Sequence, residues 1–263
     1  MDSIFSKVLN RYFDKVIVLT IERNKHRLNI IDKILSGLDY DVFIGVDGKQ
    51  LDLTELQQSN QVSANINEIY AETNSAYLNM ASPPIHINQV ACAMSHVEIY
   101  KYLLNKKGCD RILILEDDVI PVEQHLKYLE DTLKSVPNDW EVLYLGYMLN
   151  DDFSFLGNLK YHTLVTLLTS VGIKTSMLSR KQQTFPVPFS KFLRKHGAHT
   201  GTHAYGVTQS ALPKLIAMQT PLQQVAPDLL LIDAIVKNKI TSYTTKYLFF
   251  DQNNSLHSSI WDK

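Results

Sequence analysis

Three adjacent carboxylates, Glu116, Asp117 and Asp118, are the residues of this sequence that most clearly could bind a ligand or take part in catalysis. They directly follow an apolar run from Ile112 to Leu115. Neighbouring acids repel one another unless a cation or a positively charged group joins them. Mg²⁺ and Mn²⁺ favour one or two carboxylates together with phosphate oxygens, so the triplet suits a divalent metal that carries a diphosphate. A solvated acidic turn before the next helix is the alternative.

The apolar run before the triplet predicts a buried strand. Residues 112 to 115 are apolar on both faces, which is typical of a central parallel strand covered by helices on both sides. Ligands of open α/β sheets bind beyond the carboxyl ends of the strands. The triplet is therefore expected where such a ligand binds.

A strand–helix–strand unit is expected near the start of the chain. Residues 16 to 19 form a short apolar run, and apolar residues recur at helical spacing over residues 25 to 38. Residues 40 to 46 resemble a second strand, closed by the turn dipeptide Asp47-Gly48. This unit favours the α/β class, with a mostly parallel central sheet and helices on both faces.

The remaining pattern predicts one domain over residues 1 to 263. Two segments without a strong period, at about 50 to 88 and 150 to 200, are expected as excursions from the sheet. The other expected elements are helices at 89 to 105, from Pro121 to Val136, near 209 to 219 and after Pro227, and strands at 141 to 145 and 242 to 250.

The first strand–helix junction is a candidate nucleotide site. The sequence has no GxGxxG and no GxxxxGK[ST] motif, which argues against a Rossmann dehydrogenase or a P-loop enzyme. Four polar residues lie instead at the strand end and in the first helical turn, namely Thr20, Glu22, Arg23 and Arg27. Backbone N–H groups and guanidinium groups there suit phosphate or ribose, although a solvated helix face would also explain the arginines.

Composition limits the partners and the compartment. The formal net charge of the 263 residues is -1, so no global field recruits nucleic acid. Neither Cys92 nor Cys109 has a partner at metal-ligand spacing, which indicates reduced thiols in a reducing compartment. No signal-peptide-like stretch and no apolar run of membrane-spanning length occurs, so a cytoplasmic protein is expected.

Five short motifs follow one another along the chain. They are residues 16–19 with Arg23, the dipeptide Asp47-Gly48, Ala-Cys-Ala-Met-Ser-His at 91–96, Leu-Glu-Asp-Asp-Val at 115–119, and Gly-Thr-His-Ala-Tyr at 201–205. This ordered set resembles glycosyltransferase family 25, which includes bacterial lipooligosaccharide β-galactosyltransferases and the collagen galactosyltransferases. The resemblance spans most of the chain and is weakest at 50–86 and 150–198.

The resemblance implies a nucleotide-sugar transferase of the GT-A type, with the acidic triplet as its DxD-like metal motif. Asp118 would be the direct ligand of Mn²⁺ or Mg²⁺, with Glu116 beside it. Glu116 and Asp117 would also bind ribose or orient ligands, and Asp47 would contribute to the donor site. The metal would bind both phosphates of a UDP-sugar and stabilise the leaving diphosphate.

Members of this branch of the family invert the anomeric centre, so a carboxylate should deprotonate the acceptor hydroxyl. Our candidate is Asp228, in the first turn of the helix after Pro227. A helix-capping acid is an equally good reading of this position. Asp233, Asp151 and Asp152 are the reserve candidates.

The helix expected at 89 to 105 departs from the family pattern. Relatives commonly have Gly-Glu-Ile-Gly-Cys where this chain has Asn88 to Cys92. Gln89 cannot act as a base, but it can hydrogen-bond sugar hydroxyls of the donor. Ser95 and His96 match the family's Ser-His pair, and we expect packing or supporting roles for His96 and a core position for Cys92.

Two later segments complete the expected site. Thr202, His203 and Tyr205 lie where GT-A enzymes line the acceptor and donor sugar. His257 could complete a metal shell, with a mobile polar tail as the simpler reading. Residues 174–196 interleave seven cationic side chains with phenylalanines, which predicts peripheral contact with an anionic membrane or a lipid-linked glycan, or else an ordinary surface loop.

The sequence thus predicts an inverting, metal-dependent transfer of a hexose, with galactose favoured, from a UDP-sugar to a sugar hydroxyl of a lipooligosaccharide or lipopolysaccharide core. A UDP-glucose-dependent glucosyltransferase and a non-catalytic glycan-binding relative are the alternatives. A nucleotidyltransferase is a further class, but it usually has a Gly-rich, basic N-terminal loop that this sequence lacks.

Overall fold

The computed structural model describes residues 4–74, 84–149, 186–195 and 199–256, with residues 159, 163–164, 166–168 and 170–172. The strands are β1 (Lys15–Thr20), β2 (Asp41–Ile44), β3 (Arg111–Glu116), β4 (Val119–Pro121), β5 (Val142–Leu149), β6 (Val187–Pro188), β7 (Leu193–Lys195), β8 (His199–Thr208), β9 (Ser242–Thr245) and β10 (Phe250–Gln252). The helices are α1 (Ile4–Tyr12), α2 (Leu28–Ile34), α3 (Leu53–Gln58), α4 (Ile66–Thr73), α5 (Ile87–Leu104), α6 (Glu123–Leu126), α7 (Leu129–Lys134), α10 (Leu212–Met218) and α11 (Pro227–Val236), with 3-10 turns η1 (Glu22–Arg27), η2 (Gly48–Gln50) and η4 (Gln209–Ala211).

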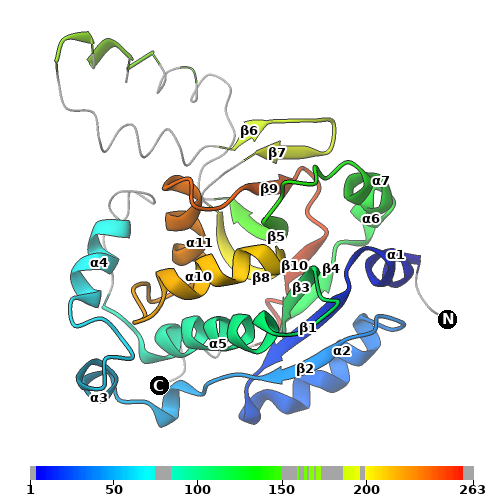
Figure 1. Cartoon of the computed structure of the whole chain (residues 1–263). Helices are drawn as coiled ribbons and strands as arrows, with labels where there is room; N and C mark the ends of the chain where they lie inside the picture. The colour runs from blue at the N-terminus through cyan, green and yellow to red at the C-terminus, as the bar shows by residue number, and fades with distance from the viewer. Residues whose placement is uncertain are drawn as a thin grey trace.

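Within the described residues, the centre of the molecule is an eight-stranded sheet in the order β2-β1-β3-β8-β5-β9-β7-β6 (Figure 1). β1 is parallel to β2 and β3, and β5 is parallel to β9. β8 is antiparallel to β3 and β5, and β7 is antiparallel to β6 and β9. Two strands therefore run against the other six, and the predicted α/β class with a mostly parallel sheet is confirmed.

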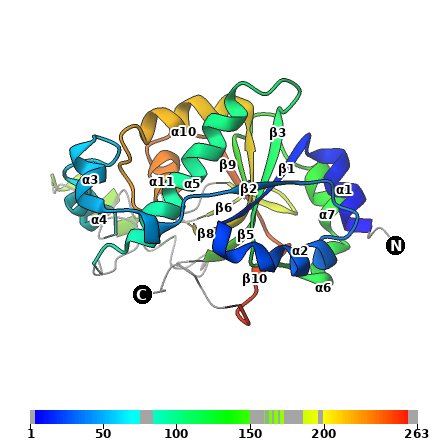
Figure 2. The ribbon, with the colours of Figure 1, turned by 90° about the horizontal axis from the view of Figure 1, so that it is seen from below.

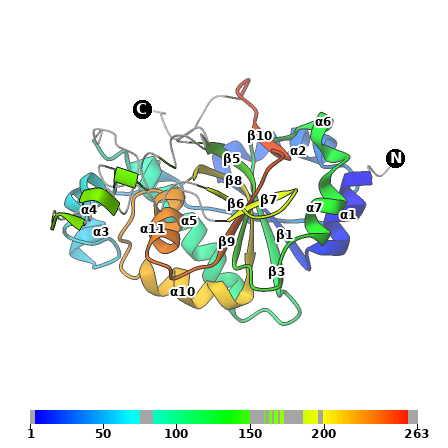
Figure 3. The same ribbon diagram turned by 90° about the horizontal axis from the view of Figure 1, so that it is seen from above.

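Alternating side chains divide the core into two layers, one on each face of the sheet. In β3, Leu113 and Leu115 pack under α1, α2 and α7, whereas Ile112 and Ile114 pack under α5, α10 and α11. All four side chains are 0% exposed, and full burial of each contributes about 1.5–3 kcal/mol. Figures 2 and 3 show the two helix groups on opposite sides of the strands. The apolar run thus makes β3 the buried inner strand that the sequence predicted, but β3 is parallel only to β1 and runs antiparallel to β8.

Helix α5 forms one wall of the pocket described below, and neighbouring residues in the sequence determine where this helix starts. The ring of His86 accepts a hydrogen bond from the Asn88 backbone, and the Gln89 side chain accepts one from the His86 backbone at 3.1 Å. This reciprocal arrangement is a capping box, which satisfies N–H groups that a helix N-terminus leaves without partners. The expected helix at 89 to 105 is confirmed, with an earlier start.

The prediction of one helix from Pro121 to Val136 was wrong. Residues Val119–Pro121 form β4, which pairs antiparallel with β10, and two short helices, α6 and α7, follow. Pro121 lacks a backbone N–H and fits the outer position of a two-stranded ladder. The expected strand at 242 to 250 is likewise divided into β9 and β10 by residues 246 to 249.

The described part of the 50–88 segment is packed rather than loose. Leu56 and Ile66, from α3 and α4, share a third core cluster with Val90 of α5 and Leu229 of α11. In Figures 2 and 3, α3 and α4 lie beyond α5 and α11, away from the sheet. None of the helices in the described ranges is both long and apolar enough to cross a membrane.

Candidate active site

A pocket opens at the carboxyl ends of β1 and β3, beside α5. The β1–η1 junction contributes Thr20, Arg23 and Arg27 to its lining, the acidic triplet lies at its floor, and α5 and β10 contribute further side chains. β1 and β3 are parallel neighbours, so residues 97 positions apart in the sequence meet at one edge of the sheet. The structure therefore brings together the two polar groups that the sequence singled out.

Asp117 is held by two partners from the β1–η1 junction. The Thr20 hydroxyl donates to its Oδ2 at 2.5 Å, and Arg27 Nη1 donates to its Oδ1 at 2.9 Å. The Arg27 and Asp117 side chains are only 8% and 10% exposed. Burial raises the pKa of Asp117, and Thr20 and Arg27 oppose that rise. Both carboxylate oxygens are engaged, so Asp117 anchors Arg27 at the floor of the pocket.

Glu116 faces the opposite side, toward β8 and α5. The Thr202 hydroxyl donates to its Oε1 at 2.9 Å, and His96 Nε2 lies 3.6 Å from the same oxygen. Burial favours a higher pKa for Glu116, but His96, His203 and Thr202 together lower it. The carboxylate is thus oriented by side chains from two further elements.

Asp118 differs from both neighbours because one of its oxygens is buried without a hydrogen-bond partner. Its backbone carbonyl accepts from the Asn253 N–H at 2.6 Å, which ties the triplet to the chain after β10. Burial and the charges of Glu116 and Asp117 raise the pKa of Asp118 to about 7. A bound cation would give the buried oxygen a partner and would offset the repulsion from Glu116 and Asp117. Of the three acids, Asp118 therefore fits a metal ligand best.

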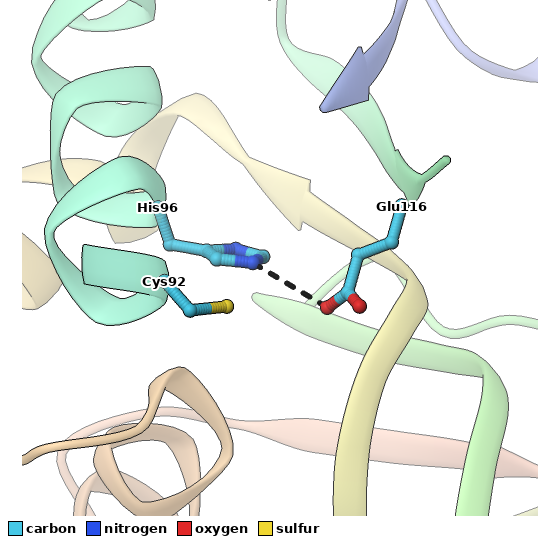
Figure 4. Close-up of side chains that lie close together, drawn as sticks. All are labelled: Cys92, His96 and Glu116. Atoms are coloured by element: carbon cyan, nitrogen blue, oxygen red, sulfur yellow. Dashed lines mark ion pairs between the residues drawn. The ribbon is translucent and has the colours of Figure 1, made fainter. Parts of the chain in front are cut away.

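Cys92, one turn before His96 on α5, lies against the same carboxylate. Figure 4 shows the Cys92 sulfur, the His96 imidazole and the Glu116 carboxylate converging from α5 and β3. Their ligand atoms lie within 4.8 Å of one another. Burial raises the pKa of the Cys92 thiol, as do the charges of Glu116, Asp228, Asp118 and Asp117. The expectation that Cys92 has no partner at metal-ligand spacing was therefore wrong, because i and i+4 share one helix face.

His96 is fixed from behind by a chain of hydroxyl groups. Its Nδ1 lies 2.8 Å from the Tyr205 hydroxyl, which lies 2.6 Å from the Tyr100 hydroxyl. All three side chains are at most 1% exposed. His96 is the supporting residue that the sequence led us to expect.

Asp228 lies at the start of α11, directly beside β8. Gly201 N donates to its Oδ2 at 3.2 Å, and Leu229 N donates to its Oδ1 at 2.9 Å. Burial raises the pKa of Asp228, against the two backbone donors. The bond to Leu229 lies within the helix start, whereas the bond to Gly201 links two elements, which a simple capping acid does not require.

A family model bears on this arrangement. The model of glycosyltransferase family 25, described as an LPS biosynthesis protein, matches residues 13–236. The chain belongs to glycosyltransferase family 25. It is therefore a glycosyltransferase, of a family linked to lipopolysaccharide biosynthesis. No curated protein matches the chain.

Among solved structures, the transferase is similar to mouse xyloside xylosyltransferase 1 in its apo form. The two are 10% identical with a TM-score of 0.32, and the match covers 88% of this chain and 75% of the other.

Three predicted donor residues of the transferase lie apart from the pocket lining. Glu22 is 67% exposed and pairs with Lys25, so it points to solvent. Gln89 is used in the cap of α5, and its neighbour Asn88 lines the pocket instead. Asp47 accepts from the Lys49 backbone and lies 3.5 Å from Arg23 Nη1, so it reaches the pocket through Arg23.

The predicted sugar-binding residues on β8 form the layer beneath the pocket. Thr202 supports Glu116, and Tyr205 supports His96. His203 is 0% exposed, and its Nε2 lies 3.3 Å from the Phe250 carbonyl oxygen. Gly146 gives His203 its room, since a Cβ there would lie 2.5 Å from His203 Nε2.

Some predicted residues take no part or lie outside the described residues. Asp233 pairs with Lys237 at 2.7 Å, one turn along α11, which explains it without catalysis. Asp151, Asp152 and His257 lie outside the described residues, as does most of 174–196.

Ser95 is the site residue whose role the sequence did not reveal. Its hydroxyl donates to the Ala91 carbonyl at 2.7 Å and accepts from the Val46 N–H at 2.8 Å. Gly45 allows this contact, because a Cβ there would lie 2.6 Å from Ser95 Oγ. Ser95 thereby joins α5 to the segment after β2. The family's Ser-His pair was the available signal, but the contact spans 49 residues.

Proposed function

We propose that this transferase moves a hexose, galactose, from a UDP-sugar to a sugar hydroxyl of a lipooligosaccharide or lipopolysaccharide core, with inversion and with Mn²⁺ or Mg²⁺. One observation carries the proposal. Asp118 has a buried carboxylate oxygen without a hydrogen-bond partner, next to the charges of Glu116 and Asp117 and in the lining of a pocket that also presents Arg23. This arrangement favours a divalent cation and the diphosphate that it binds.

Asp118 is the direct metal ligand in this proposal, and Glu116 is the carboxylate nearest to join it. When bound, the ion stabilises the negative charge that develops on the leaving diphosphate. Asp117 holds Arg27 in place, because both of its oxygens are engaged there. Arg23, at 23% side-chain exposure, is placed to contact phosphate from the wall of the pocket.

Asp228 is the proposed base that deprotonates the acceptor hydroxyl. Its two backbone donors orient the carboxylate, and its raised pKa brings it closer to the range in which a general base works well. The resemblance to the family supports an acidic residue near this position. The hydrogen bond from Gly201 of β8 keeps the Asp228 carboxylate close to the residue that precedes Thr202.

The metal assignment is tested by calorimetry of UDP binding. With Mn²⁺, we expect UDP affinity to fall at least about 100-fold in Asp118→Ala, and a chelator to have the same effect on the wild type. Asp39→Ala removes an exposed acid from a distant loop and serves as the matched control. UDP affinity unchanged by both the chelator and Asp118→Ala would refute the metal site.

The chemistry is tested by a donor screen. We expect metal-stimulated hydrolysis of UDP-Gal to exceed that of UDP-Glc and UDP-GlcNAc. Asp228→Asn should lower kcat about 10²–10⁴-fold with UDP affinity retained. Preference for UDP-Glc would select the glucosyltransferase alternative, and a normal kcat in Asp228→Asn would remove Asp228 as the base.

We also propose peripheral contact with an anionic membrane. The described end of the 174–196 segment is the hairpin of β6 and β7, on which Val187 and Phe189 are 45% and 48% exposed next to Lys191. Apolar tips flanked by cations suit an anionic lipid surface. Binding to phosphatidylglycerol vesicles should weaken in Phe189→Ser, and equal binding to neutral vesicles would contradict the proposal.

A further inference from the structure

We propose that Cys92, His96 and Glu116 form a zinc site, which shares Glu116 with the proposed hard-cation site at Asp118. The inference does not depend on which sugar nucleotide the enzyme uses. It rests on side chains from α5 and β3 that converge on one point (Figure 4). This point lies on the side of the pocket floor toward β8 and α5, which we call the inner side, and the side toward β1 is the outer side.

The geometry is that of an incomplete tetrahedron. The three ligand atoms lie within 4.8 Å of one another, and the His96 Nε2 to Glu116 Oε1 distance is 3.6 Å. Zinc bonds of about 2.0–2.3 Å place tetrahedral ligand atoms less than about 4 Å apart. A small movement of the Cys92 side chain closes the difference. Three protein ligands leave one position open, and both Cys92 and Glu116 line the pocket that reaches it.

The state of His96 is the second observation. Its side chain is 1% exposed, and Nε2 has no hydrogen-bond partner although it is buried. Its Nδ1 lies 2.8 Å from the Tyr205 hydroxyl, which can accept a hydrogen bond from the Nδ1–H group and donate its own to the Tyr100 hydroxyl. A bound cation would favour this tautomer, in which the Nε2 lone pair is directed at Cys92 and Glu116. Histidines that bind metals commonly donate the other ring N–H to a fixed acceptor in this way.

The ligand set selects the metal. A thiolate and an imidazole favour zinc over Mg²⁺ and Mn²⁺, which prefer oxygen ligands. Zinc binding releases the Cys92 proton, since the thiolate is the ligand. The neighbouring carboxylates that disfavour a free thiolate also attract a divalent cation. Glu116 would then be bound by zinc and withdrawn from the donor site, so zinc inhibits transfer supported by Mn²⁺.

The experiment uses the 263-residue chain without a tag, together with the metal alone. Titration with Co²⁺ should give tetrahedral visible bands at one ion per chain, and Cd²⁺ should give an ultraviolet thiolate-to-metal band. Competition with Zn²⁺ should remove the Co²⁺ bands. In Cys92→Ser the Cd²⁺ band should disappear, and zinc affinity should fall at least about 100-fold.

Two further variants separate this site from other thiols and from misfolding. Cys109→Ser changes the other cysteine, which contacts the Lys107 carbonyl away from the pocket, and it should keep the full Cd²⁺ band. His96→Gln should weaken Co²⁺ binding and leave the Cys92 thiol titratable. The proposal is overturned by a wild type without these bands, by a band that survives Cys92→Ser, or by one lost in Cys109→Ser.

Discussion

The two sides of the pocket floor hold neighbouring carboxylates by different means. On the outer side, Thr20 and Arg27 bind Asp117, so a buried carboxylate faces a permanent cation. On the inner side, Glu116 faces a hydroxyl and an imidazole, which are backed by two tyrosines. On the outer side the charge of Asp117 is therefore balanced by Arg27. On the inner side Glu116 has no permanent cation beside it and is open to a bound metal ion. Asp118, between them, has an oxygen that neither side engages.

The largest expected effect breaks the outer side. Arg27→Ala leaves Asp117 buried without its cation, which should lower the free energy of unfolding by about 3–5 kcal/mol, measured by urea denaturation. Adding Asp117→Asn should restore part of the loss. Arg11→Ala is the matched control, because Arg11 is 70% exposed in its pair with Glu130 and should leave the urea midpoint unchanged. Equal effects of the two arginine variants would contradict the distinction.

The second effect concerns acid sensitivity at the start of β8. Burial, and secondarily Arg194, lowers the pKa of His199 to about 3, whereas an unfolded histidine titrates near about 6.5. The unfolded state therefore binds more protons between these values, and stability falls as the pH drops below about 6.5. Protonation of His199 in the unfolded state should lower the free energy of unfolding by about 2 kcal/mol when the pH reaches 5. His199→Phe should flatten the dependence of unfolding free energy on pH, and an unchanged slope would count against burial of a neutral ring.

The third effect tests the support of the inner side. Tyr205→Phe removes the hydroxyl between His96 and Tyr100, which should cost about 1–3 kcal/mol in a thermal or urea unfolding experiment. Tyr102→Phe, on the exposed side of α5, is the control and should have little effect. A double-mutant cycle with His96→Gln should show coupling, and strict additivity would mean that the two side chains act independently.

The smallest effect concerns the link between β8 and Glu116. Thr202→Val keeps the shape of the side chain but removes the donor to Glu116, which should cost about 1 kcal/mol of unfolding free energy. Thr208→Val, at the other end of the same strand, should cost less because its partner Ser210 is at the surface. A Thr202 variant as stable as the wild type would show that His96 alone orients Glu116.

Short sequence patterns were sufficient to predict several of the strands and helices. Four apolar residues at 112 to 115 specify a strand buried on both faces, and the helix predicted over 89 to 105 corresponds to α5 (Ile87–Leu104). The pairing of β4 with β10 could not be predicted this way, because Phe250 and Pro121 meet over a long sequence separation and neither has a local signal for it. Pro121 instead resembled a helix start.

The site was predicted in part for the same reason. The triplet and Thr20 follow predicted strand ends, so parallel pairing alone brings them together. Gln89 was assigned to the donor, but its amide completes a helix cap that depends on an unusual histidine N-cap. The contact between Cys92 and Glu116 joins a helix face to a strand end, and its geometry depends on the packing of α5 against the sheet.

The Ser95 hydroxyl ties the rim of the pocket to the helix that bears Cys92 and His96. Since it bonds both the Ala91 carbonyl and the Val46 N–H, a shift of the α5 turn that bears Cys92 is transmitted to the strand-end loop across the opening. A ligand that draws Cys92 and His96 together would therefore also alter the width of the entrance, although it never touches residue 46.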